Sequence, residues 1–183
     1  MFGEDPTVEY LINKAASRSF VIRYLAGVQV DKTWLTNVYC SIIRSILEYS
    51  SVTFGPMLPA YLSNMLENVQ KRCLRSIYGQ KLSYQELLDL SGLDSLEQRR
   101  ARAITKFAQK SANNPQFQHW FPKTSNRSSL RVGKPYQEEF TRTDRLYYSP
   151  IYTMRRRLNE SPDEHRLARA DFSDLSNLFN SPY

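Results

Sequence analysis

The side chains in this sequence that are best spaced to do chemistry are cations. Lys71 and Arg75 are four residues apart, as are Arg102 and Lys106, so each pair occupies one face of a helix. Lysine and arginine in such rows bind nucleic-acid phosphates without reading the base sequence. The alternative is that these cations form an ordinary solvated helix face.

The positive charge is concentrated in a central belt. The chain carries a formal net charge of +7, of which residues 61–110 contribute +4 and residues 111–157 contribute +6. The candidate nucleic-acid-binding residues are Lys71, Arg72, Arg75, Arg99, Arg102, Lys106, Arg127, Arg131 and Lys134. Tyrosines interleaved with the later cations, namely Tyr136, Tyr147, Tyr148 and Tyr152, could stack on bases. The partner predicted by this belt is the backbone of RNA and DNA.

Other reactive residues form no catalytic or metal-binding pattern. His119 and His165 are far apart in sequence, and Cys40 and Cys73 lack the short paired spacing of a zinc site. Neither a glycine-rich phosphate loop nor a nucleophile elbow is present. We therefore expect no metal and no cofactor, and we interpret the two cysteines as small buried side chains in a reducing compartment.

The helix predicted from Tyr61 to Gln80 carries the first group of cations. Pro59 suits its first turn, and Gly79 suits a left-handed cap at its C-terminus. Apolar residues recur on one face of this helix: Leu62, Met65, Leu66, Val69, Cys73, Leu74 and Ile77. This face is expected to pack into a core.

Further helices are predicted on both sides of it. Their expected ranges are 7–26, capped by Asp5 or Thr7; 33–47, capped by Asp31 or Thr33; 83–90, with the capping box Ser83 and Glu86; and 95–112, with Ser95 and Gln98. Ser50 to Pro59 is expected to be a turn, and a short helical turn is expected to begin at Asn114 and Pro115. Short connections between helices favour a bundle.

The predicted architecture is an all-α small helical bundle with two additions. The thumb-like bundle spans residues 7–121, a basic flexible linker spans 122–135, and a peripheral C-terminal arm of short helices spans 136–183. No apolar run is long enough to cross a membrane, and the acidic start MFGEDP lacks the features of a signal peptide. We expect an intracellular protein, cytoplasmic or nuclear, that makes no contact with a membrane.

An ordered set of motifs gives the sequence a family resemblance. The first comprises Tyr39, Ile43, Arg44, Leu47, Glu48 and Tyr49, and the second comprises Leu66, Glu67, Val69, Gln70, Lys71 and Arg72. Further matches are Tyr84, Leu87, Leu90, Gly92, Leu93, Ser95, Leu96, Arg99 and Arg100, then Phe107, Asn114, Pro115, Trp120, Phe121 and Pro122, then Arg142, Arg145, Tyr148, Ser149, Pro150 and Ile151. In this order they resemble the C-terminal, post-palm region of a non-LTR (LINE-type, jockey-like) retrotransposon reverse transcriptase. The resemblance covers about Val8 to Asn159, with departures at Ser45, where a proline is usual, and at Phe54, where a tryptophan is common.

The resemblance implies a specific function. The chain would be a non-catalytic fragment of an RNA-directed DNA polymerase, whose thumb-like helices grip the template and primer beside an active site carried elsewhere. Polymerases of this kind hold metal ions with palm carboxylates, usually adjacent aspartates, and this chain contains no such pair. The missing palm would lie upstream of Met1, so we do not expect this chain alone to be an enzyme. The alternative is a helical scaffold or protein-interaction remnant without nucleic-acid binding.

Overall fold

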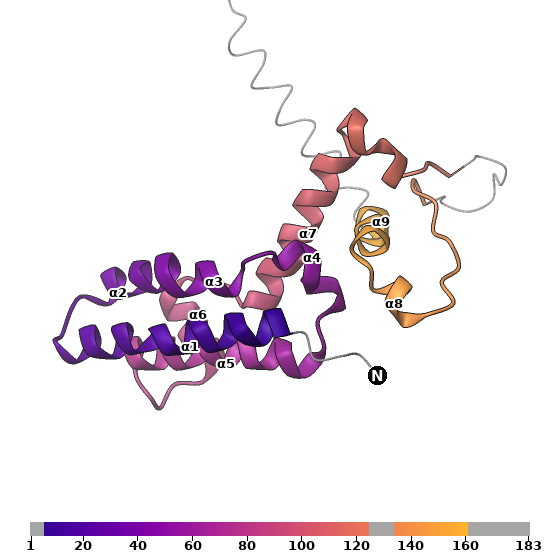
Figure 1. The fold of residues 1–183 in the computed structure, drawn as a ribbon. Helices are drawn as coiled ribbons and strands as arrows, with labels where there is room; N and C mark the ends of the chain where they lie inside the picture. The colour runs from indigo at the N-terminus through magenta and orange to yellow at the C-terminus, as the bar shows by residue number, and fades with distance from the viewer. Residues whose placement is uncertain (1–5, 125–133, 161–183) are drawn as a thin grey trace, which may run out of the picture. The chain divides into compact units, whose positions relative to one another are not determined.

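A computed structural model describes residues 6–124 and 134–160 of the chain. Within these ranges every regular element is a helix, so the all-α prediction is confirmed. The elements are α1 (Pro6–Gly27), α2 (Lys32–Tyr39), a π-helical turn (Cys40–Arg44), α3 (Ser45–Leu47), α4 (Ser51–Phe54), a 3₁₀ turn (Gly55–Met57), α5 (Ala60–Tyr78), α6 (Tyr84–Ser91), α7 (Leu96–Ala112), a 3₁₀ helix (Pro115–Trp120), α8 (Asp144–Tyr147) and α9 (Pro150–Glu160) (Figure 1).

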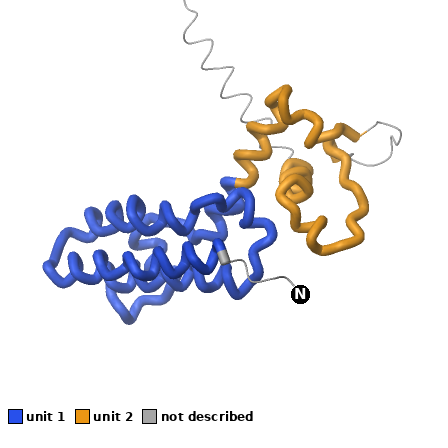
Figure 2. Tube along the Cα trace, in the orientation of Figure 1, with its two compact units in different colours: residues 1–103 blue, residues 104–183 orange. Residues whose placement is uncertain are grey.

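The chain divides into two compact units, residues 1–103 and 104–183 (Figure 2). The sequence predicted one bundle over 7–121, whereas the boundary between the units falls inside α7. The hydrophobic core of the first unit extends only to Leu96, at the start of this helix. The first half of α7 therefore belongs to one unit and the second half to the other.

The second unit is tied together by contacts that the sequence did not show. The backbone carbonyl of Trp120 accepts a hydrogen bond from Arg155 Nε (2.6 Å), and the ring of Phe121 meets that of Tyr136 edge-on. The backbone N–H of Tyr136 in turn donates to Asn159 Oδ1 (3.0 Å). These contacts are the physical reason why residues 104–121, assigned to the bundle by the sequence, group with the segment that follows them.

The two ends of the predicted linker 122–135 pair with each other. The backbone N–H of Thr124 donates to the carbonyl of Pro135 (3.2 Å), and that of Gln137 donates to the carbonyl of Pro122 (2.9 Å). An isolated antiparallel bridge joins Lys123 to Tyr136. Residues 125–133 of the linker, and residues 161–183 of the predicted arm, lie outside the described part of the chain.

The predicted helix starts follow from local side-chain chemistry. Asp31 caps α2 by accepting hydrogen bonds from the backbone N–H groups of Thr33 and Trp34, and the bond from Trp34 is the main reason that its pKa is lowered. Ser83 and Glu86 form the predicted capping box of α6. These short-range signals could be identified without knowing the fold.

Two local features differ from the prediction. Residues 51–57, expected to be a turn, form α4 and a 3₁₀ turn. Pro56 is compatible with the 3₁₀ turn because it lies at the start of that element, where a backbone N–H is not needed. Gly79 ends α5 as expected and has a positive φ of 136°, but its ψ of 151° places it in an extended region rather than in the left-handed helical one. Only glycine adopts this conformation without strain.

The core of the first unit lies where α1, α2 and α5 pack against one another (Figure 1). The predicted apolar face of α5 is buried apart from Met65, which is 41% exposed. Tyr39, Ile43 and Leu47 of the helical stretch from α2 to α3 are completely buried. Gln70, a polar residue that the apolar pattern did not place in the core, is completely buried as well.

Gln70 is held in the core by hydrogen bonds to three other segments. Its Oε1 accepts a hydrogen bond from the Tyr39 hydroxyl (2.7 Å). Its Nε2 donates to the Tyr84 hydroxyl oxygen (2.9 Å) and to the backbone carbonyl of Asp94 (3.1 Å). One amide therefore joins α5 to α2, to α6 and to the connection before α7.

Glu67 extends this network by one helical turn. It accepts a hydrogen bond from the Tyr84 hydroxyl (2.5 Å), and its second carboxylate oxygen accepts the backbone N–H of Glu97 (2.7 Å). The second bond satisfies a free N–H group in the first turn of α7. We define the Gln70 network as Tyr39, Glu67, Gln70, Tyr84 and the backbone groups of Asp94 and Glu97.

The first prediction compares two neighbouring residues of α5. Leu66→Ala should lower the free energy of unfolding by about 2 to 5 kcal/mol, because it opens a cavity in the core. Met65→Ala is the matched control, and because Met65 is partly exposed its effect should be clearly smaller. Urea denaturation followed by circular dichroism measures both, and equal effects would show that the core is wrongly placed.

The second prediction concerns alkaline pH. Burial is the main cause that raises the pKa of Tyr39 and of Tyr84 above the usual value of 10.0. The neutral phenols are therefore favoured in the folded state, and this stabilisation is complete below the pKa of tyrosine in the unfolded chain. The free energy of unfolding should fall above about pH 10, by up to about 1.4 kcal/mol per pH unit for each phenol.

The variant Tyr39→Phe tests the contribution of one phenol. Its free energy of unfolding should fall less steeply with pH above about pH 10 than that of the wild type. At neutral pH it should be less stable by about 1 to 3 kcal/mol, because Gln70 Oε1 loses its buried donor. An unchanged alkaline slope would contradict the burial of this phenol.

Candidate nucleic-acid interface

Three of the predicted cations lie together on α5. Lys71, Arg72 and Arg75 line an open hollow of about 410 Å³, together with Ile12 of α1 and with Met65 and Asn68 of α5. The residues that line this hollow include no acid. Across residues 6–124 and 134–160, none of the three cations forms an ion pair. We call Lys71, Arg72 and Arg75 the α5 cluster.

A cation of α1, which packs against α5, acts on a buried thiol of α5. Burial raises the pKa of the Cys73 thiol to about 11, and the charges of Arg72 and Arg23 act in the opposite direction. Arg23 is therefore close enough to Cys73 to act on its ionisation, although it lies on α1. Arg23 could not be selected from the sequence, because no spacing rule within a single helix shows which other helix will pack beside it.

Three other predicted cations form ion pairs with carboxylates. Arg99 forms two hydrogen bonds with the carboxylate of Glu48, and these bonds are the main reason that its pKa is raised. Arg102 pairs with Asp94 (2.5 Å), which precedes α7. Lys134 pairs with Glu138 (2.5 Å) four residues later. Each of these charges is neutralised by a neighbouring carboxylate.

The predicted belt of positive charge is divided between the two units. Lys106 is exposed on the part of α7 that belongs to the second unit. Arg127 and Arg131 lie outside the described residues. The α5 cluster is thus the part of the predicted belt that the structure brings together within one compact unit.

Several residues of the family-like motifs hold the fold together. Glu67 and Gln70 belong to the Gln70 network, and Glu48 anchors Arg99. Arg100 is buried and donates a hydrogen bond to Ser63 Oγ (2.7 Å). In the motif carried by α5, Leu66, Val69 and Gln70 are buried, Glu67 and Lys71 are partly exposed, and Arg72 is exposed.

Among the described residues, no group of three or more histidine, cysteine, aspartate or glutamate side chains could hold a metal ion. No helix within residues 6–124 and 134–160 is long and apolar enough to cross a membrane.

Comparison of the chain with known protein families, with characterised proteins and with solved structures found no match.

The third prediction separates a structural cation from a binding cation. Arg99→Lys should lower the free energy of unfolding, because lysine cannot form the two-point contact with Glu48. The loss should be only about 0.5 to 1 kcal/mol, because this pair is partly exposed to solvent. Its affinity for a nucleic-acid duplex should equal that of the wild type. Urea denaturation and a duplex titration measure the two effects. A variant that is as stable as the wild type but binds the duplex more weakly would show that Arg99 belongs to the nucleic-acid interface.

Proposed function

We propose that this chain is a nucleic-acid-binding helical module, and that it holds the template and primer backbone as the thumb-like region of a non-LTR retrotransposon reverse transcriptase. The observation that carries the proposal is the α5 cluster. Three cations line one hollow that no carboxylate shares, and none of them forms an ion pair in the described part of the chain. Cations in this arrangement are suited to backbone phosphates.

The surroundings of the α5 cluster support backbone binding rather than sequence reading. Lys71 lies over the ring of Tyr84, with Nζ 5.9 Å from the ring centroid, and this contact orients its ammonium group. Asn68 contributes a side-chain amide, which can donate a hydrogen bond to a phosphate oxygen. The ordered family motifs supply the expectation that the nucleic acid is an RNA and DNA duplex.

A scaffold or protein-interaction role is the second candidate, and one observation favours it. The side chains of Phe20, Tyr24 and Trp34 are exposed by 60%, 72% and 67%, respectively. Exposed aromatic residues are enriched in protein interfaces. A scaffold role requires no affinity for nucleic acid, so a binding measurement distinguishes the two functions.

The fourth prediction tests the α5 cluster directly. A variant with Lys71→Gln, Arg72→Gln and Arg75→Gln should bind a labelled RNA and DNA heteroduplex more weakly than the wild type. If each cation meets one phosphate, the slope of log affinity against log salt should flatten by about 2 to 3, because fewer counterions are released. Fluorescence anisotropy at several salt concentrations measures the affinity and the slope.

The control variant removes the same charge from cations that are already paired. Arg102→Gln, Lys134→Gln and Arg157→Gln changes the net charge equally, but each of these cations has a carboxylate partner. Its salt slope should stay close to that of the wild type. Equal slopes for the wild type and both variants would show that the α5 cluster is not the nucleic-acid-binding site. The scaffold role would then be the remaining candidate function.

A further inference from the structure

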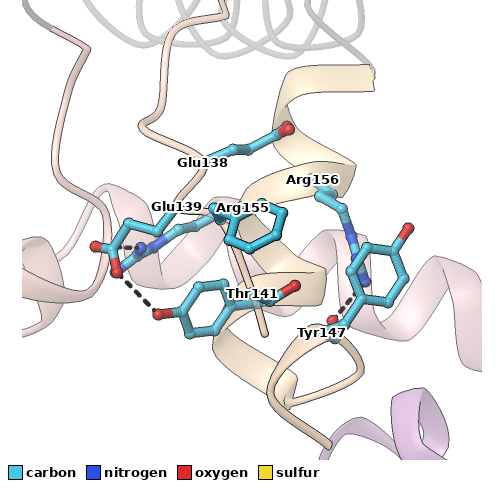
Figure 3. Close-up of a pocket in the computed structure, with 8 residues that line it drawn as sticks. Glu138, Glu139, Thr141, Tyr147, Arg155 and Arg156 are labelled. Atoms are coloured by element: carbon cyan, nitrogen blue, oxygen red, sulfur yellow. Dashed lines mark hydrogen bonds and ion pairs between the residues drawn. The ribbon is translucent and has the colours of Figure 1, made fainter. Parts of the chain in front are cut away.

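The second unit contains a pocket that takes no part in the proposed binding of phosphates by the α5 cluster. Its volume is about 330 Å³, at the low end of the range of about 300 to 1,000 Å³ typical of small-ligand sites. Its walls come from the segment before α8, from the end of α8 and from α9 (Figure 3). The lining residues are Glu138, Glu139, Phe140, Thr141, Tyr147, Tyr152, Arg155 and Arg156. We call it the α9 pocket.

A buried guanidinium group in the wall of this pocket has an unused donor. Arg155 is 8% exposed, and its Nε donates to the carbonyl of Trp120. Its NH1 nitrogen is enclosed and has no hydrogen-bond partner. NH1 lies 3.6 Å from Glu139 Oε1, which is an ion-pair distance but too long for a hydrogen bond, and Figure 3 shows the two side chains facing each other. A buried donor of this kind is costly unless a ligand or water satisfies it.

The same pocket has carboxylate acceptors beside this donor. Glu139 Oε2 accepts a hydrogen bond from the Tyr152 hydroxyl (3.0 Å), which orients the carboxylate. Oε1, the other oxygen of that carboxylate, is the atom near Arg155 NH1. The wall therefore offers a donor and an acceptor side by side. The hydrogen-bonding edge of every nucleobase has the complementary pattern, an acceptor next to a donor.

Flat, exposed groups complete the α9 pocket. Phe140 is 90% exposed, and its ring makes no aromatic contact within the described residues. Tyr147 is held by Arg156, whose guanidinium carbon lies 3.6 Å from the ring centroid and whose NH2 donates to the Tyr147 carbonyl (2.8 Å). Phenylalanine, tyrosine and arginine planes are the groups on which single-stranded bases stack.

We propose that the α9 pocket binds one unpaired nucleobase of a single-stranded nucleic acid. The base stacks on Phe140 and on the Tyr147 and Arg156 pair, and its polar edge meets Arg155 NH1 and Glu139. A phosphate is a poorer occupant, because Glu138 and Glu139 would repel it. This inference deepens the proposed function, since it adds a base-binding site to a chain whose α5 cluster holds phosphates.

The test uses the full chain and two probes of the same length. One is a short single-stranded oligonucleotide that carries 2-aminopurine, and the other is an abasic oligonucleotide with the same backbone. The wild type should bind the base-containing probe about 5- to 150-fold more tightly, which is the range for one stacked base. The fluorescence of 2-aminopurine should also change on binding, because the base leaves its neighbours and stacks on the protein.

Phe140→Ala is the decisive variant, because so exposed a side chain can be removed without disturbing a core. It should lose the preference for the base-containing probe and keep the salt slope of the wild type, since stacking releases no counterions. Phe20→Ala removes an exposed phenylalanine from α1 and is the matched control, which should keep the preference. Tyr147→Ala should reduce the preference as Phe140→Ala does.

The outcomes separate this inference from the proposed function. Equal binding of the two probes by the wild type would overturn the inference, and so would an unchanged preference in both Phe140→Ala and Tyr147→Ala. The triple α5 variant, with Lys71→Gln, Arg72→Gln and Arg75→Gln, should flatten the salt slope and keep the base preference. A base preference that persists together with an unchanged salt slope in that variant would support the α9 pocket and refute the α5 cluster.

Discussion

The buried amide of Gln70 is the interaction on which the first unit depends. Its side chain connects α5 to Tyr39 of α2, to Tyr84 of α6 and to the backbone before α7. A polar group in a core stabilises the structure only when all its hydrogen bonds are made. The network therefore favours one arrangement of these four segments over others with a similar apolar area. It also fixes the rotation of α5, which sets the direction of the cations on that helix.

The cations of this chain differ in whether a carboxylate pairs with them. Arg99, Arg102 and Lys134 have carboxylate partners, whereas Lys71, Arg72 and Arg75 share a hollow whose lining includes no acid. A cation paired within the protein has less free energy to gain from a phosphate, because it must first give up its partner. The formal net charge of +7 is thus a poor guide to an interface unless the internal pairs are known.

The two proposed binding sites differ in their chemistry. The α5 cluster presents positive charge and suits a backbone, while the α9 pocket combines aromatic planes with a buried donor and an acceptor. Phosphates and bases need these different surroundings. Tyr147 and Tyr152 were among the tyrosines selected in the sequence as base-stacking candidates. The structure adds Phe140, which no pattern of charge or periodicity had distinguished.

Local and periodic signals in the sequence determined most of the secondary structure. The apolar face of α5, the Asp31 cap and the Ser83 capping box depend on residues within a few positions of one another, so they could be predicted without the fold. The tertiary structure alone decided which polar residues are buried and which charges are paired. From the sequence alone, Gln70 would be assigned to the surface, but the fold places Tyr39 and Tyr84 beside it. Arg99 would likewise be taken for an unpaired cation, but the fold pairs it with Glu48, fifty-one positions earlier. These contacts depend on long-range packing, because no local spacing rule relates residues so far apart in sequence.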